Sequence, residues 1–205
     1  DYKKRMNEQE YSFKIITVGN ISVGKTSIFN KFIYGTFQDM VKPTIGINCL
    51  VKEMYLQDVK IKLNLFDTQG QEGNKSLPKI YFKNADCVLF VFAADDFKSF
   101  EDLKYWFNKF QDSRTNINEI LLYLIKNKND LVNNENNNDN VIFNNYAYKY
   151  NMIFKSISAK KDNSVNELFE EISEDLFENH KKLHFTKQKS VKLTRKKKKK
   201  RNCFN

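Results

Sequence analysis

The chain has 205 residues, the size of one domain, and 40% of them are hydrophobic, including 18 Phe and 10 Tyr. No stretch approaches the ~18 consecutive apolar residues that a membrane-spanning helix needs. The net charge of +10 comes from the C-terminus, because residues 181–205 hold 12 Lys and Arg and no acidic residue. Residues 1–180 hold 23 basic and 25 acidic residues, a net charge of −2. The body is therefore expected to be nearly neutral, which argues against a basic nucleic-acid-binding face.

The charge pattern predicts three regions. Residues 1–10 are polar and are expected to form a flexible arm, residues 11–181 carry the apolar patterns of a folded domain, and residues 182–205 form a basic, hypervariable tail. The cysteines at positions 49, 87 and 203 are too widely spaced for a metal-binding motif. Their spacing favours a reducing intracellular compartment.

The folded domain opens with a phosphate-binding pattern. An apolar, β-branched stretch at 11–18 predicts a strand, residues 19–26 then match G-x-x-x-x-G-K-[ST], and a helix is predicted from residue 27. A strand, a glycine loop and a helix N-terminus surround a phosphate with backbone N–H groups. Lys25 adds a positive charge, and the Thr26 hydroxyl can bind Mg²⁺. The chain is therefore expected to bind a nucleotide.

Two strands follow a loop at 35–44. The first covers about 44–56, residues 57–58 form a turn, and apolar and polar residues alternate from Val59 to Leu65. This alternation is typical of a half-buried strand. The two strands are expected to pair as an antiparallel hairpin at the edge of a sheet.

Asp67-Thr68-Gln69-Gly70-Gln71 follows the hairpin directly. An Asp there can hold Mg²⁺ directly or through water, and Gln71 can orient an attacking water. Gly70 lets the backbone approach a γ-phosphate because no Cβ intervenes. Thr44 can supply a second hydroxyl to the metal. Asp-x-x-Gly alone is common in turns, but its place after a strand and ~40 residues past a P-loop indicates a nucleotide site.

The second half of the chain alternates strands with helices. A continuous apolar run at 87–93 predicts a buried parallel strand. An Asn-, Asp- and Glu-rich stretch at 133–140 is interpreted as a solvated loop, and the last helix is expected to fray near Lys181. The other predicted strands are 119–125 and 152–157. Three more helices are predicted: one from the apolar stripe of Phe100, Leu103, Phe107 and Phe110, one at residues 141–150, and one that starts with a capping box at Ser164–Glu167.

This alternation predicts an α/β fold, the doubly wound P-loop NTPase (small G-protein) fold. We expect a mostly parallel six-stranded sheet with one antiparallel edge strand and helices on both faces. Ligands in such sheets bind beyond the carboxyl ends of the strands. The phosphate-binding loop and the motifs that follow all come after predicted strands.

Asn127-Lys128-Asn129-Asp130 closes the strand at 119–125. Guanine presents two donors that the Asp130 carboxylate can accept together, whereas adenine would turn an acceptor toward it. Lys128 can lie over the base plane with its stem. The alternative is an ordinary turn, because Asn and Asp are common turn residues. Ser158-Ala159-Lys160 follows the last strand, and its N–H groups can reach the guanine oxygen, although the tripeptide carries little information alone.

In order and spacing, these segments resemble the five motifs of Ras-superfamily small GTPases over about residues 12–180. Segments 44–47, 62–66, 76–78 and 81–86 further resemble the Rab branch. The resemblance implies Mg²⁺-dependent binding of GTP and GDP, with Gln71 as the catalytic residue, and Thr26, Thr44 and Asp67 at the metal. The implied nucleotide-binding residues are Asn20, Ser22, Val23, Gly24, Lys25, Thr26, Ser27, Phe37, Thr44, Gly70, Asn127, Lys128, Asp130, Ser158, Ala159 and Lys160.

The family implies a monomer whose exchange factor, activating protein and effectors bind switch regions around 38–48 and 68–82. Some residues depart from the family pattern. Ile21 stands where Gly or Ser is usual, and its bulk crowds the γ-phosphate, which predicts slow hydrolysis and resistance to activating proteins. The other departures are Val41 for Tyr, Phe66 for Trp, Gln69 for Ala and Gly73 for Arg.

The tail has three interpretations. Residues 195–201 are all Lys or Arg, and Cys203 lies third from the end, which is neither a C-a-a-X box nor a double-cysteine ending. A prenylated Cys203 behind a polybasic segment would bind an anionic membrane. A nuclear-localisation or nucleic-acid-binding segment is the second interpretation, and a solvated tail is the third.

We therefore expect a Rab-like GTPase that acts in vesicle and membrane trafficking, cytoplasmic and cycling onto the cytosolic face of an endomembrane. GTP would order the switch regions, and hydrolysis would release them. One alternative is a non-hydrolysing GTP-binding scaffold, which Ile21 favours. Another is a nuclear transport GTPase similar to Ran, although chains of that type end in an acidic segment.

Overall fold

The computed structural model describes residues 10–39, 42, 44, 46–68, 79–113, 119–132, 137–161 and 163–201, with the backbone alone at 137–139 and 184–201. A six-stranded sheet in the order β2-β3-β1-β4-β5-β6 forms its centre. The hairpin of β2 and β3 is antiparallel and every other pair is parallel, which confirms the predicted sheet. The strands are β1 Glu10–Val18, β2 Ile47–Leu56, β3 Val59–Thr68, β4 Cys87–Ala93, β5 Leu121–Asn127 and β6 Ile153–Ser156.

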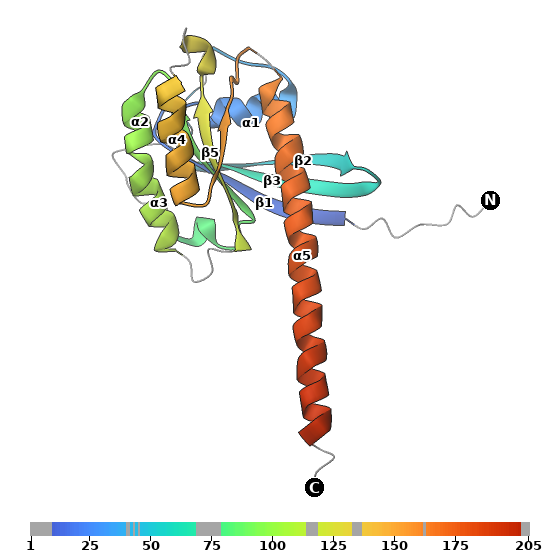
Figure 1. Cartoon of the computed structure of the whole chain (residues 1–205). Helices are drawn as coiled ribbons and strands as arrows, with labels where there is room; N and C mark the ends of the chain where they lie inside the picture. Colours follow the sequence, from blue (N-terminus) through green and yellow to red (C-terminus); the bar gives the residue numbers. More distant parts are fainter. Residues whose placement is uncertain are drawn as a thin grey trace, which may run out of the picture.

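Helices cover both faces of the sheet (Figure 1). They are α1 Lys25–Tyr34, α2 Phe97–Glu101, α3 Leu103–Gln111, α4 Asn137–Lys149 and α5 Ser164–Arg201, with short 3₁₀ turns η1 Lys79–Phe82 and η3 Asn129–Leu131. Helices α1 and α5 pack on one face, and α2, α3 and α4 pack on the other. Each face of the sheet has its own hydrophobic core, the first under α1 and α5 and the second under α2, α3 and α4. Neighbouring residues of β1 point to opposite faces, since Ile15 belongs to the first core and Ile16 to the second.

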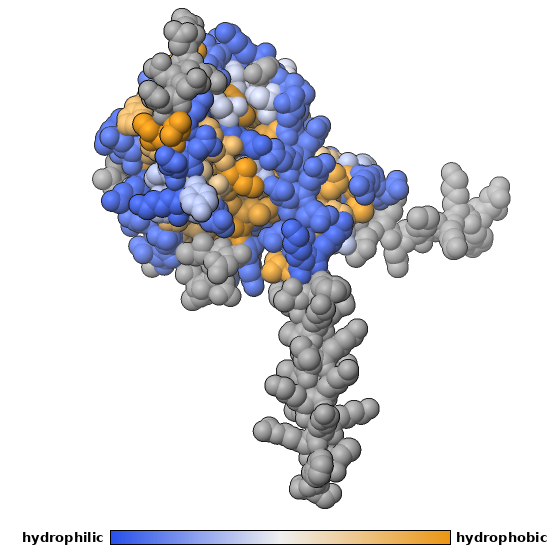
Figure 2. All heavy atoms as spheres, in the orientation of Figure 1, coloured by the Kyte–Doolittle hydropathy of each residue, from blue (hydrophilic) through white to orange (hydrophobic). Residues whose placement is uncertain are grey.

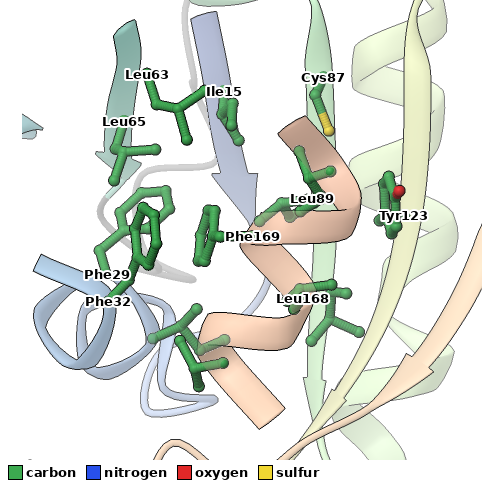
Figure 3. Close-up of a cluster of buried hydrophobic side chains, with 14 of the residues drawn as sticks. Ile15, Phe29, Phe32, Leu63, Leu65, Cys87, Leu89, Tyr123, Leu168 and Phe169 are labelled. Carbon is green, nitrogen blue, oxygen red and sulfur yellow. The ribbon is translucent and has the colours of Figure 1, made fainter. Parts of the chain in front are cut away.

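The first core shows how the apolar patterns position the site. Phe169 of α5 is fully buried and stacks on Phe32 of α1, with ring centroids 4.0 Å apart (Figure 3). This contact fixes α1, which begins at Lys25, within the phosphate-binding motif of residues 19–26. The predicted apolar stripe of the last helix is confirmed, because Val165, Leu168, Phe169, Ile172 and Leu176 are all buried.

The second core is rich in aromatic rings. The predicted stripe Phe100, Leu103, Phe107 and Phe110 is buried, but it belongs to two helices, α2 and α3, which meet at Asp102. Helix α4 begins at Asn137, so part of the stretch interpreted as a loop at 133–140 is helical. Phe143 holds α4 against α2, because its ring centroid lies 4.8 Å from that of Phe100.

The last helix is longer than the sequence predicts. It does not end near Lys181 but continues as one helix of 38 residues to Arg201, beyond the body of the molecule (Figure 1). No Gly or Pro interrupts residues 164–201, and Lys and Arg are good helix formers. The boundary at 181/182 therefore lies inside a helix.

The surface is largely hydrophilic along α5, and apolar groups are exposed between α5 and α4 (Figure 2). The edge strand β6 is half-buried along its length. No helix in the described part of the chain combines the length and the apolar character that crossing a membrane requires.

Candidate nucleotide-binding site

A cavity of about 380 Å³ lies beyond the carboxyl ends of the parallel strands, where the sequence places its ligand. It brings together residues from the phosphate loop, the loop after α1, the ends of β3 and β5, and the loop after β6. The lining residues are Ile21, Ser22, Gly24, Lys25, Thr26, Ser27, Phe37, Gln38, Asp39, Lys42, Thr44, Thr68, Asn127, Lys128, Asp130, Leu131, Ala159 and Lys160.

Two glycines permit the tight path of the phosphate loop. A Cβ added at Gly19, where φ is +146°, would lie 2.1 Å from the carbonyl oxygen of Val91. A Cβ added at Gly24, where φ is +94°, would lie 2.2 Å from Nδ2 of Asn127. These close approaches and positive φ angles require glycine at both positions of the motif.

The Lys25 ammonium is held over the loop. It donates hydrogen bonds to the carbonyl oxygens of Gly19 at 2.9 Å and Asn20 at 2.7 Å. Its burial lowers the pKa of Lys25 from 10.5 to about 8, and the nearby Asp67 carboxylate partly opposes this shift. A phosphate in the cavity would favour the charged form.

Three oxygen-bearing side chains converge at the N-terminus of α1. The Thr26 hydroxyl donates to Asp67 Oδ2 at 2.6 Å, the Thr44 hydroxyl donates to the same oxygen at 3.1 Å, and the two hydroxyls are 2.8 Å apart. Asp67 is buried, and its Oδ1 has no hydrogen-bond partner among the described residues. Burial raises the pKa of Asp67, and the hydrogen bonds from Thr26 and Thr44 oppose the shift. Hydroxyl and carboxylate oxygens with an unpaired acceptor fit Mg²⁺.

The base-recognition motifs are tied together by hydrogen bonds. The Asn127 amide donates to the Val23 carbonyl at 2.9 Å, and Asn127 Oδ1 accepts from the Ala159 N–H at 3.2 Å. The Ser158 hydroxyl donates to Asp130 Oδ1 at 2.6 Å. The Ser164 hydroxyl at the start of α5 accepts from the Ser158 N–H at 3.1 Å, so α5 helps to position this loop.

Two ion pairs and one aromatic ring involve residues of the cavity lining. The Lys160 ammonium lies 5.5 Å from the Phe37 ring centroid and donates to Asp39 Oδ1 at 2.7 Å. The ammonium of Lys128, which also lines the cavity, lies 3.5 Å from Asp95 Oδ1. Lys128 has φ +62°, which turns the chain sharply between β5 and η3.

Most predicted site residues that the structure describes line the cavity, but four do not. Asp67 lies behind Thr26 and Thr44 and accepts hydrogen bonds from their hydroxyls. Val23 is buried beneath the loop, Ser158 hydrogen-bonds to Asp130 from outside the lining, and the Asn20 side chain is directed toward α3. Gln71, Gly70 and Cys203 lie outside the described residues, so their roles stay predictions. The same holds for the departures at Val41, Gln69 and Gly73.

Sequence reasoning did not name several lining residues. Gln38, Asp39 and Lys42 lie in the segment 38–48 and are predicted to bind partners and not the nucleotide, and Leu131 follows Asp130 without belonging to a motif. Ile21 lines the cavity with 45% of its surface exposed, as expected for a side chain directed at the phosphate site.

Comparison with known proteins identifies the family of this chain. A family model described as "Ras family" matches residues 14–178. The chain belongs to the Ras family. Within it, the chain is Rab-like, because proteins with Rab names match over most of its length. Membership in this GTPase family implies binding of a guanine nucleotide.

Three relatives illustrate the similarity. "Putative ras-related protein Rab-5B" of Dictyostelium discoideum is 35% identical over 85% of this chain and 80% of its own length. "Ras-related protein Rab-18" of Lymnaea stagnalis is 33% identical over 84% of this chain and 85% of its own length. "Ras-related protein RABG3f" of Arabidopsis thaliana is 34% identical over 79% of this chain and 81% of its own length.

Proposed function

We propose that this Rab-like GTPase binds GTP and GDP with Mg²⁺, hydrolyses GTP slowly, and switches effector binding in membrane trafficking. The proposal is carried by the hydroxyls of Thr26 and Thr44, which line the cavity and converge on the Asp67 carboxylate. Thr44 comes from the loop before β2, so a metal bound here would connect that loop to the phosphate site. Residues 38–48 would then report which nucleotide is bound.

Each group of residues is proposed to bind one part of the nucleotide or the metal. Backbone N–H groups at the start of α1 and the Lys25 ammonium orient the phosphates. Thr26, Thr44 and Asp67 would hold Mg²⁺, which neutralises charge on the phosphates when bound. Asp130 accepts the two guanine donors, and Phe37 packs against the base. Gln71 is proposed to orient the attacking water.

Ile21 is the reason for proposing slow hydrolysis. Its half-exposed side chain borders the cavity in the phosphate loop, where a catalytic Gln or a partner's arginine would need room. The same observation favours a second candidate function, a scaffold that holds GTP without hydrolysing it. A switch hydrolyses its bound GTP, whereas a scaffold retains it.

Phosphate release from GTP-loaded protein separates these two functions. The purified chain would be loaded with GTP, freed of excess nucleotide and started with Mg²⁺, alone and with candidate activating proteins. We expect slow release of one phosphate per protein. Retention of intact GTP under all conditions would favour the scaffold, and failure to retain any guanine nucleotide would contradict both.

The tail is proposed to bring the switch to the cytosolic face of an endomembrane. Twelve basic residues and no acidic ones in 181–205 would bind an anionic leaflet, and prenylation of Cys203 would supply the second membrane signal. Intact mass after expression in a prenylating cell tests the modification. Imaging the tagged chain beside Cys203→Ser tests its consequence, and an unchanged distribution would contradict a lipid at this position.

A further inference from the structure

The side chain of Asn20, in the phosphate loop, makes both of its hydrogen bonds outside the nucleotide cavity. Asn20 Oδ1 accepts from the Trp106 indole N–H at 3.1 Å, and Asn20 Nδ2 donates to Asp102 Oδ2 at 2.8 Å. Asn20 is 7% exposed and Trp106 is 5% exposed, so water has little access to these groups. A buried amide and a buried indole N–H each need a hydrogen-bond partner. Here the Asn20 amide supplies the acceptor for Trp106, and Asp102 supplies the acceptor for the Asn20 amide.

The backbone of the same residue holds the phosphate-binding lysine. The Asn20 carbonyl accepts from the Lys25 ammonium at 2.7 Å. The next residue, Ile21, lines the cavity, and the preceding Gly19 is pressed against the Val91 carbonyl of β4. The start of the loop is therefore held by β4 on one side and by α3 on the other. Movement of Asn20 would move both the support of Lys25 and the loop at the phosphates.

We propose that Asp102 and Trp106 are positioning residues for the nucleotide, which act through Asn20 and slow nucleotide release without lining the cavity. We call the three side chains the α3 clamp. Asp102 lies between α2 and α3, and its second oxygen accepts from the Lys98 ammonium at 3.2 Å. Trp106 lies one turn further along α3 and is anchored in the second core. Trp106 is thus fixed by packing and Asp102 by its ion pair with Lys98, which gives the loop a support from α3. This inference rests on the proposed nucleotide binding.

A polarity swap tests the clamp. In Asn20→Asp the side chain loses its donor and places a second carboxylate against Asp102, so the hydrogen bond becomes a repulsion. In Asp102→Asn an acceptor remains for the Asn20 amide. In the double variant Asn20→Asp, Asp102→Asn the donor and acceptor exchange sides, Trp106 keeps its acceptor, and the net charge of the pair equals that of the wild type.

The readout is the rate at which a fluorescent ribose-labelled GDP leaves the protein in excess GDP and Mg²⁺. We expect release about tenfold faster in Asn20→Asp, less than about threefold faster in Asp102→Asn, and within about threefold of the wild type in the double variant. Trp106→Phe, which keeps an aromatic ring and removes the donor, should speed release about threefold to tenfold.

A control variant on α3 separates faster release from a general loss of stability. Phe110 is fully buried on α3 and packs against Phe82 and Phe90, so Phe110→Leu should lower the melting temperature without speeding release. Release as slow in Asn20→Asp as in the wild type, or no recovery in the double variant, would overturn the clamp while leaving nucleotide binding intact. A wild type that retains no labelled GDP would overturn the proposed function, and the clamp with it.

Discussion

The Lys160 ammonium donates a hydrogen bond to Asp39 at 2.7 Å, joining the loop after β6 to the loop after α1 across the mouth of the cavity. The two residues are 121 positions apart in the chain. The same ammonium lies 5.5 Å from the centroid of the Phe37 ring. Hydrogen bonding to Asp39 raises the pKa of Lys160. All three residues line the cavity, and Phe37 is the residue proposed to pack against the base.

Asp39→Asn should speed GDP release by less than about threefold, because the pair is exposed and screened by solvent. The difference from the wild type should shrink as salt is added, since a surface ion pair weakens at high ionic strength. Stopped-flow release at low and high salt measures both effects. Lys181→Gln serves as a control, because it removes a comparable exposed pair, with Glu178, far from the cavity.

GDP affinity should fall above about pH 8. The buried Lys25 has a pKa of about 8 in the nucleotide-free protein, and a bound phosphate raises that value. The charged form is present below pH 8, so binding is strongest there, and it weakens as the pH rises and the free protein loses the proton. Affinity should drop about tenfold between pH 7 and pH 9.

Calorimetric titration at several pH values measures this dependence. In Lys25→Arg the guanidinium keeps its charge over the whole range, so binding, though weaker, should lose the pH dependence. A wild-type affinity that is flat from pH 7 to 9 would contradict the assignment to Lys25.

Ile21→Ser should speed single-turnover GTP hydrolysis about threefold to tenfold, because a smaller side chain leaves room for the water and for Gln71. Phosphate release from preloaded protein measures the rate. Val51→Ser is the matched control, since Val51 is a similarly exposed apolar residue on β2, outside the cavity lining. If the rate is unchanged in Ile21→Ser, the bulk of this residue is not what limits turnover.

Tyr123→Phe should lower the free energy of unfolding by about 1–2 kcal/mol, because it removes a hydrogen bond to a carboxylate. The fully buried Tyr123 of β5 donates to Asp175 Oδ2 of α5 at 2.5 Å. Burial, together with this bond, raises the pKa of Tyr123 above its ordinary value. Urea denaturation measures the loss. Tyr148→Phe, at a residue that is 91% exposed, should change nothing.

Much of the fold could be predicted because its signals are local. The run at Cys87–Ala93 is the whole of β4, and the alternation from Val59 identified β3. The glycines of the phosphate loop were predictable for the same reason, since their spacing reflects steric demands within one loop. Helix ends have weaker local signals. The Asn-rich start of α4 has the composition of a loop, and the basic residues after Lys181 continue one helix although they resemble a tail.

The parts of the site that sequence reasoning missed depend on contacts between distant residues. Nothing near Asp39 predicts that Lys160 will reach it, and the apolar stripe that includes Phe107 gives no sign that Trp106 holds the phosphate loop. Asn20 was predicted as a nucleotide-binding residue from its place in the motif. In the structure its carbonyl accepts a hydrogen bond from Lys25, while its side chain hydrogen-bonds to Asp102 and Trp106 at α3.

Base selectivity tests the central claim most directly. Titration calorimetry of the nucleotide-stripped chain with GDP and with ADP, each with Mg²⁺, compares the base at constant phosphate chemistry. Asp130 lines the cavity, and we propose that its carboxylate accepts two guanine donors. We therefore predict that GDP binds at least about 100-fold more tightly than ADP, and that Asp130→Asn loses most of this preference. Equal affinity for GDP and ADP in the wild type would contradict the account.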